Sequence, residues 1–452
     1  MKLPALKPAQ TLLLSFSVVI LAGAVLLAMP WASRGDPLSW VDALFTATSA
    51  TCVTGLIVVD TGSKLSTFGQ GTVLALIQLG GLGIMTFSSI FLVLLGKRLS
   101  FRNQDVLSST LGNTRRSSIT AMVRNVFIFT LTIEAVGALF LSLGFSSHMP
   151  FEQALYSGIF HSVSAFCNAG FSLYSDSFIH YRGDFIINVT IMFLIVLGGI
   201  GFLVLQDMLK AWTRRRKGKT VRLTLHTEVV LSTTAILIIG GAIGIWLFER
   251  NNTLEQLPVG EQVMASFFQS ITARTAGFNT LDYSMLTNTS LFLTMILMFI
   301  GASPGSCGGG VKTSTVAIVA SMFRGGLKSR HTVNIFQRTI PERTISKALA
   351  IIMLSFVFVT IMTFLLMAAE VSSVPHRGGG GTFMELFFEV MSAFGTVGLS
   401  TGITSNLSPV GKIIIVFTML AGRLGPLTLA MALGPGEKKG RFQYAEENVV
   451  VG

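Results

Sequence analysis

The sequence predicts an all-α membrane protein built from four tandem repeats, each made of a helix, a short re-entrant helix, a loop and a second helix. Three observations support this prediction: an apolar composition, an alternation of basic and acidic loops, and one motif that occurs four times. Hydrophobic residues make up 51% of the 452 residues, charged residues only 12%, and the mean hydropathy is +0.68. Because a soluble chain carries about 25% charged residues, this composition excludes a soluble globular protein.

Long apolar stretches predict the membrane-spanning helices, since about 20 apolar residues cross a hydrocarbon layer. They cover residues 12–29, 72–95, 123–143, 187–205, 229–248, 291–301, 348–368 and 413–433. We therefore expect eight spans, of which the one ending at Gly301 is interrupted. The first stretch follows Lys2 and Lys7, as in a secretory signal. Its apolar run exceeds the usual length of about 7–15 residues, so we expect a retained helix.

The loops between these stretches alternate in charge, within a net charge of +12. Basic residues gather in the ranges 97–124, 210–222, 324–347 and 438–441, and the alternate loops are acidic. Cytoplasmic loops are the ones rich in Lys and Arg, so both termini and the basic loops are expected in the cytoplasm. The outer acidic residues would concentrate cations at an entrance. They include Asp36, Asp42, Asp60, Glu249, Glu385 and Glu389.

One ungapped motif places a phenylalanine ten residues before a glycine, with Ser or Thr at the fourth place and Ala after it. Its copies cover residues 45–55, 160–170, 267–277 and 388–398. A second, glycine-rich marker begins 24 to 28 residues after each copy, at 80–83, 198–201, 301–305 and 422–425. The expected repeats are 1–100, 101–222, 223–340 and 341–452, the last with the C-terminal tail.

Each motif predicts a half-helix that ends at membrane depth. The four half-helices and the eight full spans are expected to surround one central, potassium-channel-like pore. Non-helical backbone at that depth must be buried or line a watery cavity. Helix C-termini and loop carbonyls would there face a cation, and glycine permits the positive φ that this needs. For a single glycine, close helix packing is the alternative.

The predicted filter walls are residues 51–55, 166–170, 274–277 and 394–398. The candidate ion-binding residues are Thr51, Cys52, Val53, Thr54, Gly55, Phe166, Cys167, Asn168, Ala169, Gly170, Arg274, Thr275, Ala276, Gly277, Gly395, Thr396, Val397 and Gly398. The bound ion is expected at the four glycines of this set.

One proline and five glycines should break the third repeat between residues 301 and 310. We expect the segment 301–315 to unwind below the filter and to form a movable gate; a plain break between two helices is the alternative. The candidate gate residues are Gly301, Ala302, Ser303, Pro304, Gly305, Ser306, Cys307, Gly308, Gly309, Gly310, Lys312 and Arg423. The segment does not match the phosphate-loop pattern, because Val311 separates Gly310 from Lys312.

Two arginines stand near these segments. Arg423 at bilayer depth is expected either to add a positive barrier to cation passage or to pair with carbonyls at a helix end. Arg274 is expected to hydrogen-bond backbone and brace its loop. No Ser/His/Asp, paired-carboxylate or metal-ligand pattern occurs, and Cys52, Cys167 and Cys307 show no C-x-x-C spacing. Enzyme activity, an organic cofactor, disulfides and zinc are therefore not expected.

The four motif copies, the glycine-rich break and Arg423 together resemble the Trk/Ktr/HKT superfamily of potassium transporters, over essentially the full chain. Filter segments 168–171, 274–278 and 396–399 carry this resemblance. Within the superfamily the chain is similar to the membrane subunit of bacterial Ktr systems, because the two extra N-terminal helices of Trk-type subunits are not expected before residue 9.

The resemblance implies K⁺ uptake across the bacterial inner membrane by a homodimer with one pore per subunit. It also implies a cytosolic KtrA-type regulatory ring that binds ATP or ADP, for which the basic range 210–222 and the third-repeat loop are the expected docking faces. Na⁺ activates some members. A serine at the first filter glycine accompanies Na⁺ permeation in the family. All four positions are glycine here, so K⁺ is the expected ion.

Three alternatives stay open at this point. The first is a sodium-permeable or sodium-coupled transporter of the same superfamily. The second is a coupled secondary transporter for another solute, although such proteins usually show inverted halves. The third is the membrane part of an ATP-driven sodium pump, which would need an intramembrane carboxylate in the transport path and an ATPase domain.

Overall fold

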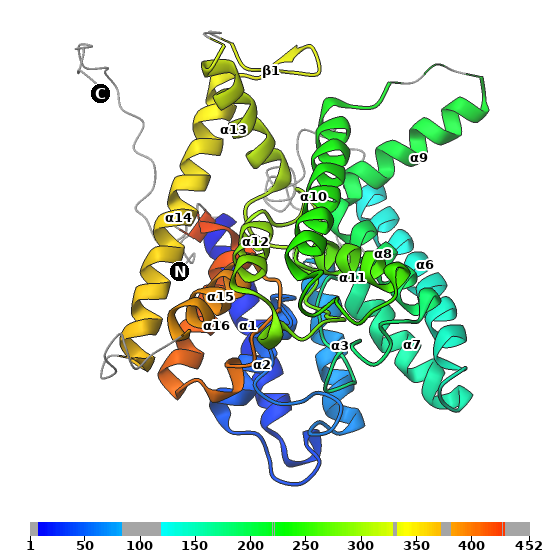
Figure 1. Ribbon diagram of the computed structural model, residues 1–452, viewed down its shortest axis with the longest axis vertical. Helices are drawn as coiled ribbons and strands as arrows, with labels where there is room; N and C mark the ends of the chain where they lie inside the picture. The colour runs from blue at the N-terminus through cyan, green and yellow to red at the C-terminus, as the bar shows by residue number, and fades with distance from the viewer. Residues whose placement is uncertain are drawn as a thin grey trace, which may run out of the picture.

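The computed structural model of the protein describes residues 8–83, 119–218, 220, 222–328, 332–371, 381–426 and 428–429. Helices dominate this part of the chain (Figure 1), and its β structure is an antiparallel pair of two-residue strands, β1 (Asn334–Ile335) and β2 (Arg338–Thr339). Residues 84–95 of the second apolar stretch, the basic residues between 97 and 116 and the basic tail lie outside the described residues.

The helices follow a recurring order of one long helix, one short helix and a further helix. This order runs through α1 (Pro8–Ala28), α2 (Trp40–Thr51), α3 (Thr67–Leu82), α6 (Ile119–Phe145), α7 (Phe151–Phe166), α8 (Phe185–Ile200), α10 (Leu225–Glu249), α11 (Val259–Thr272), α12 (Asn288–Phe299), α14 (Glu342–Glu370), α15 (Thr382–Gly395) and α16 (Pro409–Leu424). Further elements are α9 (Phe202–Arg216), α13 (Thr313–Gly326) and the 3₁₀ turns η1 (Pro30–Ala32), η3 (Tyr283–Met285) and η5 (Thr404–Asn406). In Figure 1, α14 and α6 lie on opposite sides of the molecule.

Local side-chain signals position the starts of these helices. In six of them the residue before the first turn accepts a hydrogen bond from a backbone N–H that has no partner within the helix. These capping residues are Ser39, Ser66, Asp184, Thr224, Thr287 and Ser408. Glu249 at the end of α10 also accepts from the Thr287 N–H, at 2.9 Å, and Glu370 at the end of α14 accepts from the Ser408 N–H, at 3.0 Å. The ends of α10 and α14 thus hold the starts of α12 and α16.

The number of predicted full spans exceeds what helix length alone supports. Within the described residues, α6 from Arg124, α10 and α14 are long and apolar enough to cross a membrane, and α8 with α9 would count as a fourth span if the bent pair is one. The other helices are shorter, such as α12 with 12 residues. The predicted stretch 187–205 is wrong at its far end, because the chain bends by 99° between α8 and α9. Gly201, with φ +91°, makes this bend, since positive φ is a conformation that glycine adopts readily.

Several acidic residues predicted in outer loops lie in helices instead. Glu249 is the last residue of α10, Asp42 lies in the first turn of α2, and Glu385 and Glu389 lie in α15. Glu389 is fully buried and accepts hydrogen bonds from the hydroxyls of Ser400 and Thr404. The acidic fringe is therefore smaller than predicted, because several of these carboxylates hold helix ends and loops together.

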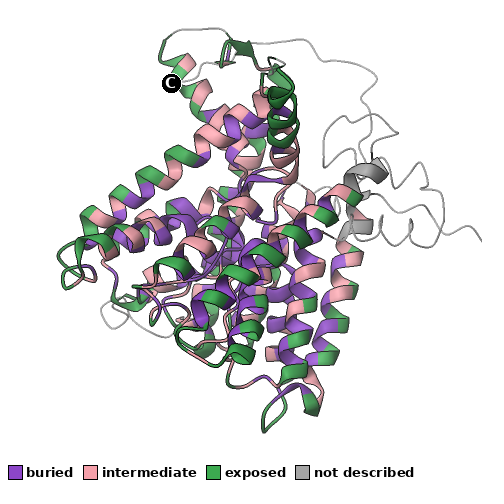
Figure 2. Ribbon diagram, turned by 90° about the vertical axis from the view of Figure 1, so that its right-hand side faces the viewer, coloured by how far each residue is buried: buried purple, intermediate pink, exposed green. Residues whose placement is uncertain are grey.

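The repeated motif lies in the core of the molecule. Its hydroxyl and alanine positions are all completely buried: Ser49, Ala50, Ser164, Ala165, Thr272, Ala273, Ser392 and Ala393. Phe45, Phe160 and Phe388 are buried as well, whereas Phe267 is half-buried and its neighbour Phe268 occupies the core. Figure 2 shows the buried residues gathered in the middle and the exposed residues around the outside. Small side chains at these positions let the four short helices end close together.

Candidate functional site

The four motif glycines form a closed ring at the ends of the four short helices. A Cβ added to Gly55 would lie 3.1 Å from Gly170 Cα, and one added to Gly170 would lie 2.9 Å from Gly277 Cα. A Cβ added to Gly277 would lie 3.2 Å from Gly398 Cα, and one added to Gly398 would lie 2.8 Å from Gly55 Cα. Segments that are more than a hundred residues apart in sequence therefore meet around one centre.

The backbone has the same unusual conformation in all four segments. The glycine has a positive φ of 70° to 92°, and the residue two places before it also has a positive φ. These residues are Val53, Asn168, Thr275 and Thr396, with φ of 57°, 60°, 79° and 50°. A positive φ is unfavourable for β-branched residues such as Val and Thr. The packing of the core holds this strained conformation in all four copies, and such strain is common at functional sites.

The repeated hydroxyl-bearing position anchors each segment. Its backbone carbonyl accepts a hydrogen bond from the residue before the glycine in every copy, in the pairs Thr54–Ser49, Ala169–Ser164, Ala276–Thr272 and Val397–Ser392, at 2.7 to 2.9 Å. The hydroxyls of Ser49 and Ser392 also accept from the N–H groups of Gly55 and Gly398, at 3.1 and 3.0 Å. These N–H groups are thereby turned away, and the carbonyls are left as the polar groups available to an ion.

The second glycine marker brings another helix against the end of each short helix. A Cβ at Gly80, Gly198 or Gly422 would overlap the last carbonyls of α2, α7 and α15, respectively. In the third copy the glycine instead packs against the loop, because a Cβ at Gly301 would overlap the Gly309 carbonyl. In the sequence this marker indicated only the alignment of the repeats. Its signal, a glycine at a constant distance from each motif, could have revealed the close approach.

The first residues of the predicted filter walls have helical backbone. Thr51, Phe166 and Gly395 lie in the last turns of their helices, and Cys52 and Cys167 are helical caps. The non-helical conformation begins at the four positive-φ residues before the glycines. In three copies helical hydrogen bonding extends to the positive-φ residue itself, because Val53, Asn168 and Thr396 donate to carbonyls of the short helices.

Arg274 does not brace its loop through backbone contacts, as the sequence predicted. Its guanidinium lies 3.5 Å from the Thr234 hydroxyl on α10, and the side chain is only 7% exposed. Because α10 packs against α11, the Arg274 side chain interacts with α10, and only its backbone contributes to the wall. Behind the second wall, the buried His161 accepts from the Leu173 N–H at 3.2 Å and so supports the loop that follows Gly170.

A cavity of about 120 Å³ lies on one side of the ring and is lined by all four glycines. Asp60 is the only carboxylate among its lining residues. Burial raises the pKa of Asp60, but hydrogen bonds from Ser175, Ser63 and Gly62 outweigh this effect and hold the pKa below its ordinary value. A charged carboxylate therefore stands at the mouth of the ring.

The predicted break in the third repeat is confirmed as non-helical backbone between α12 and α13, across residues 301–310. Residues 301–310, which we call the intramembrane loop after their expected depth, lie beside two of the predicted walls. A Cβ at Gly308 would meet the Thr275 side chain. The Gly309 N–H donates to the Thr396 hydroxyl at 2.8 Å. On another side, the N–H groups of Ser303 and Cys307 donate to the carbonyls of Gly199 and Gly198. The loop is thus bonded to α8 and to the fourth wall.

Two cationic side chains hold this loop. Lys312 Nζ donates to the carbonyls of Gly308 and Gly309, at 2.7 and 3.4 Å. The Arg423 guanidinium donates to the carbonyls of Cys307 and Gly80. Of the two roles expected for Arg423, pairing with carbonyls therefore describes its contacts. It joins α16, α3 and the loop at one point.

The chemistry of this site is that of backbone carbonyls and hydroxyls. Within the described ranges, no cluster of three His, Cys, Asp or Glu side chains could hold a metal ion, and the three cysteines are free. Carbonyl oxygens arranged around one centre replace the hydration shell of a monovalent cation. The apolar spans and this central ring define a multi-pass membrane transport protein.

A family model described as TrkH, cation transport protein, matches residues 6–438. The chain therefore belongs to the TrkH family of cation transport proteins. The expected resemblance to the Trk/Ktr superfamily and to a KtrB-type subunit is confirmed by the relatives of this chain. The Ktr system potassium uptake protein B of Vibrio alginolyticus is 42% identical over 445 residues, which cover 98% of this chain and 94% of that protein.

Two further similarities are informative. The potassium/sodium uptake protein NtpJ of Enterococcus hirae is 36% identical, over 99% of this chain and 98% of that protein. The crystal structure of the potassium transporter TrkH from Vibrio parahaemolyticus matches with a TM-score of 0.74 and 18% identity, over 96% of this chain and 86% of that one. The all-α membrane fold is therefore shared with TrkH, and the similar proteins are uptake proteins rather than enzymes.

Proposed function

We propose that the chain takes up K⁺ through one pore surrounded by its four repeats, 1–100, 101–222, 223–340 and 341–452, with eight spans and four re-entrant helices. The closed ring of Gly55, Gly170, Gly277 and Gly398 is the observation that carries this proposal. Each glycine follows the C-terminal end of a short helix, where the helix dipole favours a cation. The relatives named as potassium uptake proteins support the choice of ion.

The intramembrane loop is the proposed gate. Its Gly309 N–H donates to the Thr396 hydroxyl, and the N–H groups of two further loop residues donate to carbonyls of α8. Lys312, which follows the loop, donates to loop carbonyls rather than to an acidic side chain. Such a loop can move as a unit when these few hydrogen bonds break, because no helix or sheet holds it internally. Arg423 would then be released from the Cys307 carbonyl and change the local charge of the pathway.

We place the protein in the bacterial inner membrane, with both termini in the cytoplasm, according to the basic loops. The proposed partners are a second copy of the chain and a cytosolic KtrA-type ring that binds ATP or ADP. The name of the Vibrio relative, a protein B of a Ktr system, supports a further subunit. The exposed arginines Arg214, Arg215 and Arg216 at the end of α9 offer a docking face for it.

Uptake of K⁺ and Na⁺ into a strain that lacks its own potassium uptake systems tests the proposal. The chain is expressed alone and together with a KtrA-type subunit, and growth and ⁸⁶Rb⁺ uptake at limiting K⁺ are measured. We expect growth to be restored, more strongly with the partner. Absence of rescue despite normal membrane insertion, with Na⁺ flux retained, would overturn the K⁺ assignment.

The alternative function is transport that includes Na⁺, either as a permeant or as an activating ion. The relative in Enterococcus hirae, named a potassium/sodium uptake protein, favours this alternative. Liposomes with a K⁺ gradient and either Na⁺ or choline outside distinguish the two roles. Na⁺ that accelerates K⁺ flux without entering is an activator, whereas ²²Na⁺ accumulation identifies a permeant ion.

A further inference from the structure

A cavity of about 780 Å³ lies between α10 and α13, outside the glycine ring and the intramembrane loop. Figure 1 shows these two helices diverging toward the end of α13 that carries β1. The space exists because α13 turns small side chains toward it, among them Ala317, Ala320 and Ser321. Residues spaced by three and four lie on one helix face, so this face of α13 leaves room beside α10.

The lining of the cavity changes from apolar to basic along α13. Val316, Ala320 and Arg324 line it and follow one another at intervals of four residues on α13, and Lys328 lines it two residues after the helix ends. At a rise of about 1.5 Å per residue, Val316 and Arg324 are about 12 Å apart along the helix. Opposite the apolar part, α10 contributes Leu237 and other residues of its first half. Among the lining residues there is no acidic side chain to neutralise the two cations.

In the proposed orientation, the cavity spans the region where a membrane changes from acyl chains to headgroups. α10 is long and apolar enough to cross the membrane, and Arg324 and Lys328 are exposed at the end assigned to the cytoplasm. The hairpin beyond α13 adds the exposed aromatic side chain of Phe336 to the rim. Aromatic side chains are enriched at this depth, and basic pockets between spanning helices on the cytoplasmic side bind anionic headgroups.

We propose that this cavity binds one anionic phospholipid of the cytoplasmic leaflet, such as phosphatidylglycerol. Its phosphate would pair with Arg324 and Lys328, and an acyl chain would lie along Val316 and Leu237. A soluble anion would leave the apolar part of the cavity unused, and an uncharged lipid would leave both cations unpaired. The proposal depends on the proposed membrane orientation and not on which ion is transported.

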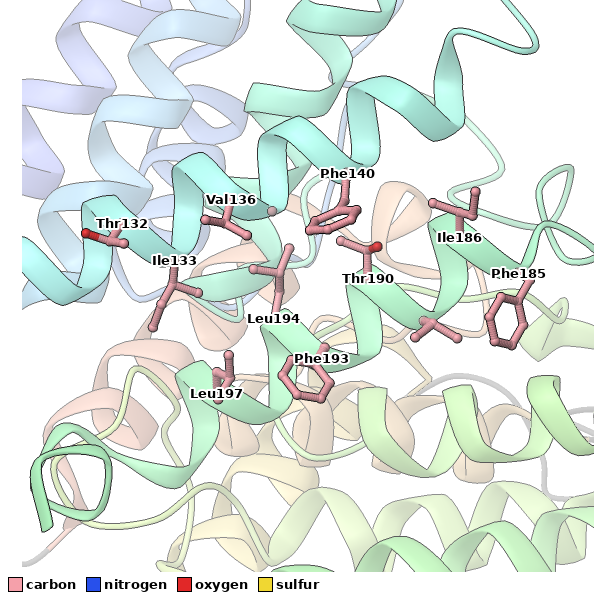
Figure 3. A pocket seen from close by; sticks show the side chains of 12 residues that line it. Thr132, Ile133, Val136, Phe140, Phe185, Ile186, Thr190, Phe193, Leu194 and Leu197 are labelled. Carbon is pink, nitrogen blue, oxygen red and sulfur yellow. The ribbon is translucent and has the colours of Figure 1, made fainter. Parts of the chain in front are cut away.

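A second groove lacks the basic side chains that would select an anionic headgroup in the cavity between α10 and α13. It has a volume of about 500 Å³ and lies between α6 and α8, where Val136, Phe140 and Phe193 line it (Figure 3). No charged side chain lines this groove. It can therefore accept any acyl chain without preference for a headgroup, which makes it a suitable control.

Native mass spectrometry of the purified full-length protein tests the proposal, with phosphatidylglycerol titrated against phosphatidylcholine. We expect preferential binding of phosphatidylglycerol by the wild type. The double variant R324Q/K328Q should lose this preference by about tenfold or more, since each basic side chain near an anionic lipid strengthens binding several-fold. A320F, which fills the cavity without removing charge, should lose it as well.

Two control variants complete the experiment. R343Q/K347Q removes two exposed basic residues of α14 that do not line the cavity, and V136F fills the groove between α6 and α8. Both should bind phosphatidylglycerol like the wild type. Equal loss in R343Q/K347Q would overturn the site, as would unchanged binding in R324Q/K328Q. Equal protection against thermal unfolding by soluble glycerol phosphate would overturn the lipid assignment. These readouts measure binding, so a failure to transport K⁺ does not affect them.

Discussion

The Gly309 N–H donates a hydrogen bond to the Thr396 hydroxyl across 2.8 Å, joining the intramembrane loop to the fourth filter wall. The two residues are 87 positions apart in sequence. Thr396 itself has a positive φ of 50°, so a strained residue of the wall also holds the loop. Conformational change in either segment is therefore coupled to the other.

Replacing Thr396 by valine should weaken the closed position of the loop. The substitution keeps the β-branched shape and removes the acceptor of the Gly309 N–H, a bond worth about 1 kcal/mol. We expect basal K⁺ flux of the subunit alone, measured in liposomes, to rise several-fold. Thr363→Val in α14 removes a buried hydroxyl that bonds only to the Val359 carbonyl of its own helix, and should leave the flux unchanged. Equal flux in both variants would contradict the coupling.

Deleting residues 303–309 tests whether the loop obstructs the pathway at all. The deletion removes the carbonyl that pairs with Arg423 and the N–H that pairs with Thr396. Basal flux without a partner subunit should increase, and control by the partner should disappear. A flux equal to that of the wild type, in a variant that reaches the membrane, would show that the segment is only a helix break.

Gly55→Ser should increase Na⁺ permeation relative to K⁺. A side chain at this position is strained at φ +92° and would approach Gly170 Cα to about 3.1 Å, so the ring must rearrange. Because the ring is closed, Gly277→Ser should also alter selectivity. Gly71→Ser serves as the control, since a Cβ there meets nothing within 4 Å. Reversal potentials or paired ⁸⁶Rb⁺ and ²²Na⁺ fluxes measure the ratio; unchanged selectivity at both ring positions would refute the filter assignment.

Asp60→Asn should raise the KM for K⁺ several-fold and leave the maximal rate nearly unchanged. A carboxylate beside the mouth concentrates cations by long-range attraction, and this effect should fade at high ionic strength. Since the pKa of Asp60 lies below its ordinary value, its charge is retained as pH falls from about 8 to about 5. The contribution of Asp60 to the wild-type KM should therefore stay constant over this pH range. A KM of the variant that equals the wild type at low salt would exclude this role.

Much of the site could be predicted from the sequence because its signals are local. The glycine, the hydroxyl and the alanine of each motif occur at fixed spacing within eleven residues. Glycine and proline disrupt the helix at 301–310 whatever the tertiary surroundings of this segment are. The bend at Gly201 was missed, although the same glycine-rich marker stands there. The bend was missed because the apolar residues continue to residue 205, and composition carries no information about the φ angle of Gly201.

The recurring glycines, the loop and the apolar stretches were determined by the sequence itself, because backbone propensity and hydrophobicity act within a few residues. Only the tertiary structure decided that the four glycines close into one ring and that Val53 and Thr396 adopt positive φ, since that strain is maintained by packing from other helices. The same holds for the arginines. Arg423 bonds to carbonyls 116 and 343 residues away, whereas Arg274 is drawn to α10. A long cationic side chain reaches whichever acceptor the folded chain brings near, and sequence spacing carries no information about that distance.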